Sequence, residues 1–272
     1  MSFCLVNAQN GVKYFKSDSI KTKHGFSTRH AGVSVASHLK SLNLGFGRGD
    51  TDETVKENYK IFCASVGTDF TSLVSAKQIH SNKVIRIGKN LQNLGGKSGN
   101  ILGLEAYEAD GFITDEENIT LAVKVADCVP ILLYDETSGI IGALHAGWRS
   151  TLARICENFL HVASEMGASA KNFKVAIGQS IGRCCFTVGD EYINTLESEF
   201  GKDFKNRFLF ERGDGTYSSD LALINEEILV SCGVLRKNID ILGKCTCCDT
   251  DTFFSHRGQK GERGTMCAII SK

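Results

Sequence analysis

Three short motifs hold a cysteine and two histidines, which are residue types that bind metal ions. Cys128 lies in the motif ADCVP (126–130), His145 in HAGWR (145–149) and His80 in KQIH (77–80). One thiolate and two imidazoles make three protein ligands and leave one coordination position open, as in catalytic zinc sites. The motifs therefore predict an enzyme in which His80, Cys128 and His145 are both the metal ligands and the catalytic residues.

The chain between Cys128 and His145 predicts a β-hairpin that returns the histidine to the cysteine. Residues 130–134 and 140–144 are continuous apolar runs, typical of strands buried on both faces. The segment 135–139 between them has the composition of a turn. Gly147 permits a sharp turn into a helix that we predict over 150–166 and that ends at Gly167.

Further strands and helices alternate along the chain. Strand composition occurs at 72–79, 83–87, 111–114 and 121–125, and helical patterns occur at 54–66 and 221–230, the last with Ser219 or Asp220 as its cap. Hairpins mixed with helices favour an α/β (α+β) fold with mixed sheets over an all-parallel sheet. We predict one domain over residues 1–272, with the glycine-rich segment 94–100 as an inserted loop.

Composition excludes several classes of partner. The chain has 31 basic and 31 acidic residues, so it lacks the basic excess that binding to nucleic acid or anionic lipid requires. Its 42% of hydrophobic residues is ordinary for a globular protein. No apolar run approaches the roughly 20 residues of a membrane helix. Eleven cysteines without a recognisable signal peptide predict reduced thiols in the cytoplasm.

Other polar groups carry weaker signals. The glycine-rich segment 176–185 predicts either a phosphate-binding turn or a plain tight turn. Cys184 and Cys185 could complete a second metal site with the cysteines at 245, 247 and 248, but the spacing fits poorly because a second C-x-x-C pair is missing. Arg149 follows Trp148 at the start of the predicted helix, where the two could contact an anion and stack on a ring. Arg29 is a further candidate for lining a substrate pocket.

Taken together, nine segments resemble one family. They are FSTR (26–29), LNLG (42–45), KQIH (77–80), ADG (109–111), ADCVP (126–130), HAGWR (145–149), SIG (180–182), CC (184–185) and FFS (253–255). In this order they are similar to the laccase-domain family, long labelled multicopper polyphenol oxidases and now understood as zinc-dependent purine nucleoside phosphorylases. The chain departs from the family pattern at Gln179, Arg183 and His256, which makes substrate preference less predictable than the metal site.

The resemblance implies both a fold and an activity. The fold would be one α/β domain with mixed sheets layered between outer helices, similar to the deamidase domain of cytotoxic necrotising factor. Zn²⁺ would be held by His80, Cys128 and His145. The substrates would be phosphate and the nucleosides adenosine, inosine, guanosine and methylthioadenosine, with adenosine deamination by zinc-activated water as a second reaction. We expect a monomer or a small homo-oligomer.

Residue roles beyond the metal ligands stay open at this point. Arg149 or Arg29 could bind phosphate through bidentate contacts. Zinc, or a proton from Asp127, could stabilise the departing purine.

Three other functions remain open. A copper-dependent polyphenol oxidase is disfavoured, because the chain has only seven histidines and no His-X-His pair. A metal-free hydrolase with a Cys128 nucleophile and a His145 base would leave His80 without a role. A non-enzymatic nucleoside sensor would bind these ligands without turnover.

Overall fold

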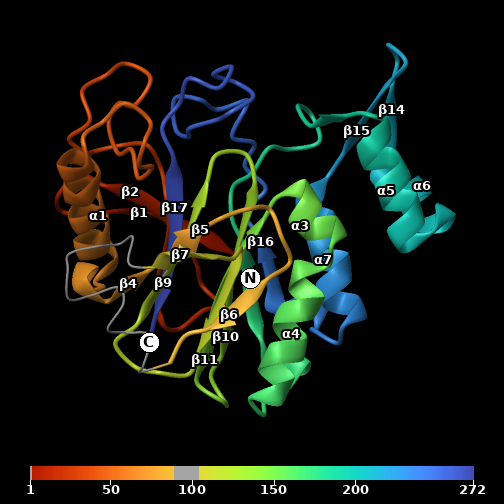
Figure 1. Ribbon diagram of the computed structural model, residues 1–272, viewed down its shortest axis with the longest axis horizontal. Coiled ribbons are helices and arrows are strands. Elements are labelled where there is room, and N and C mark those ends of the chain that lie inside the picture. The colour runs from red at the N-terminus through yellow and green to blue at the C-terminus, as the bar shows by residue number, and fades with distance from the viewer. Residues whose placement is uncertain (1, 89–103) are drawn as a thin grey trace.

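Two six-stranded sheets lie face to face, with helices on their outer sides (Figure 1). The computed structural model describes residues 2–88 and 104–272. The predicted loop 94–100 lies outside the described residues. The buried layer between the sheets includes Val123 and Met266 from one sheet and Leu132 and Ala143 from the other.

The first sheet is mixed and carries α1 (Asp52–Val66) on its outer face. Val55, Tyr59 and Phe62 of α1 pack against Ala122 and Ile269 of this sheet. All strand pairs are antiparallel except the last, which joins β4 to β9. The strand order is β1 (Phe3–Asn7), β2 (Lys13–Ser17), β3 (Lys23–Ser27), β17 (Met266–Ser271), β9 (Thr120–Val125) and β4 (Leu73–Val74).

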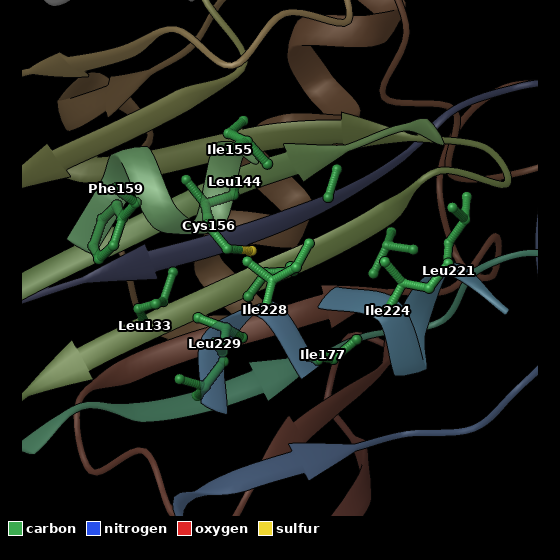
Figure 2. Close-up of a cluster of buried hydrophobic side chains, with 14 of the residues drawn as sticks. Leu133, Leu144, Ile155, Cys156, Phe159, Ile177, Leu221, Ile224, Ile228 and Leu229 are labelled. Carbon is green, nitrogen blue, oxygen red and sulfur yellow. The ribbon is translucent and has the colours of Figure 1, made fainter. Parts of the chain in front are cut away.

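The second sheet is also mixed and is covered by α3 (Trp148–Leu152), α4 (Ile155–Glu165) and α7 (Leu221–Ser231). Figure 2 shows Phe159 and Cys156 of α4 and Ile228 of α7 packed over Leu133 and Leu144. The strand order is β16 (Ile239–Ile241), β12 (Lys174–Ile177), β10 (Val129–Asp135), β11 (Ile140–Ala146), β8 (Gly111–Thr114) and β6 (Val84–Arg86).

Smaller elements complete the described part of the chain. A three-stranded sheet lies beside α5 (Asp190–Phe200) and α6 (Lys202–Phe208), and its order is β13 (Thr187–Val188), β15 (Thr216–Ser219) and β14 (Leu209–Arg212). A parallel pair joins β5 (Ala76–Lys77) to β7 (Leu104–Glu108). Short 3₁₀ helices are η1 (Phe70–Ser72), η2 (Ala170–Asn172) and η3 (Arg236–Asn238).

The mixed α/β fold is confirmed, and two element predictions need correction. The helix predicted over 150–166 is two helices, because Arg154 has a left-handed backbone (φ 62°) that interrupts helical hydrogen bonding. Apolar periodicity continues across this break, with Leu152, Ile155 and Phe159 all buried, so the pattern hides it. The strand predicted over 72–79 is likewise divided, since β4 belongs to the first sheet and β5 pairs with β7.

The remaining expected elements agree with the structure to within a few residues. The strands predicted at 83–87, 111–114, 121–125, 130–134 and 140–144 are β6, β8, β9, β10 and β11, and Asp220 caps α7. Within the described residues, no helix has both the length and the apolar character needed to cross a membrane.

Candidate metal centre

The β10–β11 hairpin places Cys128 beside His145. In this hairpin Val129 pairs with Ala146 and Pro130 pairs with His145, so the residue before β10 and the end of β11 meet at one edge of the second sheet. At the other end, the Gly139 amide donates to the carbonyl of Asp135 and closes the turn. The hairpin was predicted from sequence and is confirmed.

His80 reaches the same edge from the segment that follows β5. Its Nε2 lies 3.8 Å from the Cys128 sulfur, and its ring centroid lies 4.9 Å from that of His145. One ligand atom from each of the three residues lies within 4.8 Å of the others. The structure therefore brings His80, Cys128 and His145 close enough for one ion to bridge them.

Asp110 organises this cluster, although no role was predicted for it from the sequence. Its Oδ1 accepts hydrogen bonds from His145 Nδ1 (2.8 Å) and the His80 amide (3.0 Å). Its Oδ2 accepts from the Ile79 amide (3.2 Å), and from the Ser81 amide (2.7 Å) and hydroxyl (2.9 Å). Because Nδ1 of His145 is bonded to the carboxylate, Nε2 is the nitrogen left for a metal. The available signal was the ADG motif, which places Asp110 directly before β8.

The hydrogen bonds and charges around the cluster favour its ionised form. Burial opposes ionisation of Cys128, but the charge and hydrogen bonds of His145 and His80 lower the pKa of the thiol to about 6. Burial likewise opposes protonation of His145, while Cys128 and Asp110 raise the pKa of the imidazole to about 9. A thiolate is the form of cysteine that binds metals and acts as a nucleophile.

Gly147 leaves the room that this cluster occupies. A Cβ atom at this position would lie 2.7 Å from Cδ2 of His80 and 3.2 Å from the Cys128 sulfur. Both distances are shorter than ordinary van der Waals contact, so any larger residue would push the histidine or the cysteine away. The glycine of the HAGWR motif is therefore required by this close approach, in addition to the turn into α3.

The cluster lies where two cavities of about 280 Å³ each adjoin. His80, Cys128 and Arg263 line both of them. One cavity is largely apolar and is also lined by Trp148, Ile181, Phe186, Leu221, His256 and Arg257. The other is basic and is also lined by Phe46, Arg48, Lys77, Gln78, Lys124 and His145.

The two arginines predicted to bind substrate lie in different places. Arg29 donates to the carbonyls of Lys40 and Thr250 and stacks over the ring of Phe254 at 4.4 Å, and it is not among the residues that line either cavity. Arg149 stacks over Trp148 at 4.0 Å and pairs with Glu191 in an adjoining hollow. Two of the basic residues that do line the second cavity, Arg48 and Arg263, were missed because no motif marks them.

Asp127 and the three departures from the family pattern also have defined positions. Both carboxylate oxygens of Asp127 are engaged, one by the Thr246 hydroxyl and the other by the Arg257 amide. His256 lines the apolar cavity. Gln179 is fully buried and donates to the Ser27 carbonyl, while Arg183 stacks over Phe210.

Comparison with known sequences decides the family. A sequence model described as multi-copper polyphenol oxidoreductase laccase matches residues 23–272. The chain belongs to this family. The resemblance predicted from the motifs is therefore confirmed.

Relatives within the family carry the names of nucleoside enzymes. Purine nucleoside phosphorylase YlmD of Bacillus subtilis is 31% identical over 248 residues, which is 90% of this chain and 87% of the relative. Adenosine deaminase RL5, from an unknown prokaryotic organism, is 30% identical over 246 residues, covering 88% of this chain and 90% of the relative. The crystal structure of YlmD from Geobacillus stearothermophilus superposes with a TM-score of 0.84 at 28% identity, over 95% of this chain and 96% of that one.

Proposed function

We propose that this chain is a zinc-dependent purine nucleoside phosphorylase that also deaminates adenosine. The observation that carries the proposal is the position of the His80–Cys128–His145 cluster between an apolar cavity and a basic cavity. The two substrates match the two cavities, because a purine is a flat, weakly polar ring and phosphate is a compact anion. The names of the relatives YlmD and RL5 support the same pair of activities.

The apolar cavity suits the purine base. Trp148 and Phe186 supply aromatic surfaces, and Ile181 and Leu221 supply aliphatic ones. Trp148 and Phe186 both pack edge-on against Tyr192, at centroid distances of 5.8 and 5.6 Å. The aromatic walls are thus supported from behind, which favours a preformed slot for a flat ring.

The basic cavity suits phosphate, and Arg263 is the residue that we assign to it. Nη1 of Arg263 donates to the Gly264 carbonyl and the Thr265 hydroxyl, but its buried Nε has no partner in the described structure. Burial, and then the nearby charge of Arg48, lower the pKa of Arg263 to about 10. An anion in this cavity would offset the positive charges of Arg263 and Arg48 and relieve the repulsion between the two guanidinium groups.

The donor set of the cluster fits zinc. One sulfur and two ring nitrogens converge, the second nitrogen of His145 is held by Asp110, and three ligands leave a position open. When bound there, zinc supplies Lewis acidity for the departing purine or for water. Arg263 and Arg48 would hold phosphate so that one oxygen attacks the anomeric carbon as the bond to the purine nitrogen breaks. The apolar cavity would exclude water from that bond during phosphorolysis.

Asp127 would act as a positioning residue. Because Thr246 and Arg257 occupy both of its oxygens, its carboxylate fixes the segments that carry His256 and Arg257 into the apolar cavity. This assignment differs from the alternative in which Asp127 supplies a proton to the purine.

A metal-free cysteine hydrolase is the second candidate, and the lowered pKa of Cys128 beside His145 favours it. The placement of His80 favours zinc, because its Nε2 faces the sulfur as a third ligand would. His80→Ala separates the two: loss of zinc and phosphorolysis together supports the metalloenzyme, whereas full activity in metal-free buffer supports the dyad. Metal analysis of the purified protein also decides between zinc and the copper of the family label.

The decisive assay follows adenosine and inosine with and without phosphate and separates the products by chromatography. We expect free base and ribose 1-phosphate only when phosphate is present, and inosine from adenosine without it. Arg263→Gln removes a charge-assisted contact of about 1.5–3 kcal/mol, so the KM for phosphate should rise roughly 10–100-fold. Arg149→Gln is the matched control, and a larger rise in that variant would overturn the assignment of the phosphate site. Binding without turnover of any nucleoside would reveal a sensor.

A further inference from the structure

Four cysteines from two segments that are distant in the sequence meet at the edge of the second sheet that carries the candidate metal centre. One ligand atom from each of Cys184, Cys185, Cys245 and Cys248 lies within 4.8 Å of the others. From the sequence, a metal site here fitted poorly because a second C-x-x-C pair is missing, and α5, α6 and α7 separate the two halves of the cluster along the chain. Their meeting is a property of the tertiary structure.

The parallel pairing of β12 and β16 brings the two segments together. Both strands end at the same sheet edge, and the chains continue side by side beyond it through a parallel bridge between Ser180 and Cys245. Thr246 donates from its amide to the Ser180 carbonyl and extends this pairing. The turn at 182–186 and the turn that starts at Cys245 are thus held next to each other by backbone contacts.

The distances between the sulfurs fit a tetrahedral ion. Cys248 lies 3.4 Å from the sulfur of Cys184 and 3.4 Å from that of Cys185. Zinc–sulfur bonds of about 2.3 Å in a tetrahedron place neighbouring sulfurs about 3.8 Å apart, so small adjustments would complete the shell. The Gly182 amide donates to the Cys245 sulfur at 3.2 Å, a contact that would stabilise a metal-bound thiolate.

We propose that Cys184, Cys185, Cys245 and Cys248 form a second, structural zinc site. Four thiolates close the coordination shell, so this ion would have no open position for substrate. A disulfide explains the cluster less well, because Cys248 is equally far from two partners and a disulfide joins only one of them.

The site would fix the walls of the apolar cavity. The turn at 182–186 leads from Ile181 to Phe186, and the segment after Cys248 leads to His256 and Arg257, all of which line that cavity. Arg257 also donates to the Cys185 carbonyl at 3.2 Å and so connects the cysteine cluster to the cavity wall. Zinc at these four cysteines would take no part in the proposed reaction, so the second site stands or falls separately from the proposed function.

The experiment measures zinc per chain in the purified full-length protein and in three variants. We expect two ions in the wild type, matching the two clusters, and one ion each in Cys128→Ala and Cys248→Ser. Cys247→Ser is the matched control, because this thiol lies inside the same turn but outside the four-sulfur group, and it should retain both ions.

X-ray absorption on Cys128→Ala identifies the ligands directly and does not depend on whether the other variants fold. We expect only sulfur neighbours at about 2.3 Å. A wild-type protein with a single zinc ion that Cys128→Ala removes would overturn the proposal. The same holds for nitrogen ligands in the absorption spectrum, for iron in place of zinc, or for a disulfide between these cysteines in mass spectra of the non-reduced protein.

Discussion

Replacing Asp110 with asparagine tests whether this carboxylate builds the metal centre. The side chain is fully buried, and its two oxygens accept four N–H bonds and one hydroxyl bond. Burial opposes its ionisation, but the hydrogen bonds from His145 and Ser81 keep the pKa of Asp110 below its ordinary value. Asparagine has almost the same shape but replaces one of the two acceptors with a donor.

Either orientation of the new amide leaves two N–H donors without an acceptor. If its NH₂ group takes the place of Oδ1, His145 Nδ1 and the His80 amide lose their partner. If it takes the place of Oδ2, the amides of Ile79 and Ser81 lose theirs, while the Ser81 hydroxyl can rotate. Each orphaned donor costs about 1–3 kcal/mol, so we expect Asp110→Asn to lose at least about 2 kcal/mol of unfolding free energy. Loss of the partner that orients His145 should weaken zinc binding about 10–100-fold.

Urea unfolding and competition with a zinc chelator measure the two effects. Asp115→Asn is the matched control, since Asp110 directly precedes β8 and Asp115 directly follows it. The Asp115 side chain is 41% exposed and forms a surface ion pair with Arg86. Such pairs contribute about 0–1 kcal/mol, so this control should change neither quantity much. An Asp110→Asn protein with unchanged stability and unchanged zinc affinity would refute the role assigned to the carboxylate.

Two further predictions concern space and protonation. Gly147→Ala should lower zinc affinity on the order of 10–100-fold while the protein stays folded, because the added Cβ would contact His80 and Cys128. The measurement is the same competition with a zinc chelator. Gly189→Ala is the control, because nothing lies within 4 Å of a Cβ added at that position. His24 accepts the Ser17 amide at Nε2 and contacts the Thr22 carbonyl through Nδ1, and burial lowers the pKa of this histidine below 6.5. The unfolded chain therefore binds the extra proton first, and His24 should make stability fall as pH drops below about 6.5, by up to about 1.4 kcal/mol per pH unit. His24→Gln should remove this pH dependence of the unfolding free energy measured in urea. His161→Gln, which changes an exposed histidine, should keep it. Identical pH slopes in the wild type and both variants would show that His24 does not titrate in this way.

Much of the fold followed from local patterns in the sequence. The apolar runs and the turn composition at 135–139 were enough to predict the β10–β11 hairpin, because both signals are short-range. The same hairpin accounts for the meeting of Cys128 and His145. The break at Arg154 was not predictable in this way, since a single left-handed residue leaves the apolar periodicity intact.

The residues around the metal ligands were decided by contacts between distant segments. Asp110 meets His145 because β8 pairs with β11, and Arg263 reaches the basic cavity because its segment leads into β17 in the first sheet. The four-cysteine cluster depends on the pairing of β12 with β16, two strands separated by three helices in the sequence. Residue type and spacing along the chain thus determined which side chains could bind a metal. Apart from Cys128 and His145 in the predicted hairpin, only the tertiary structure decided which of them meet, because strand pairing between remote segments leaves no short-range signal in the sequence.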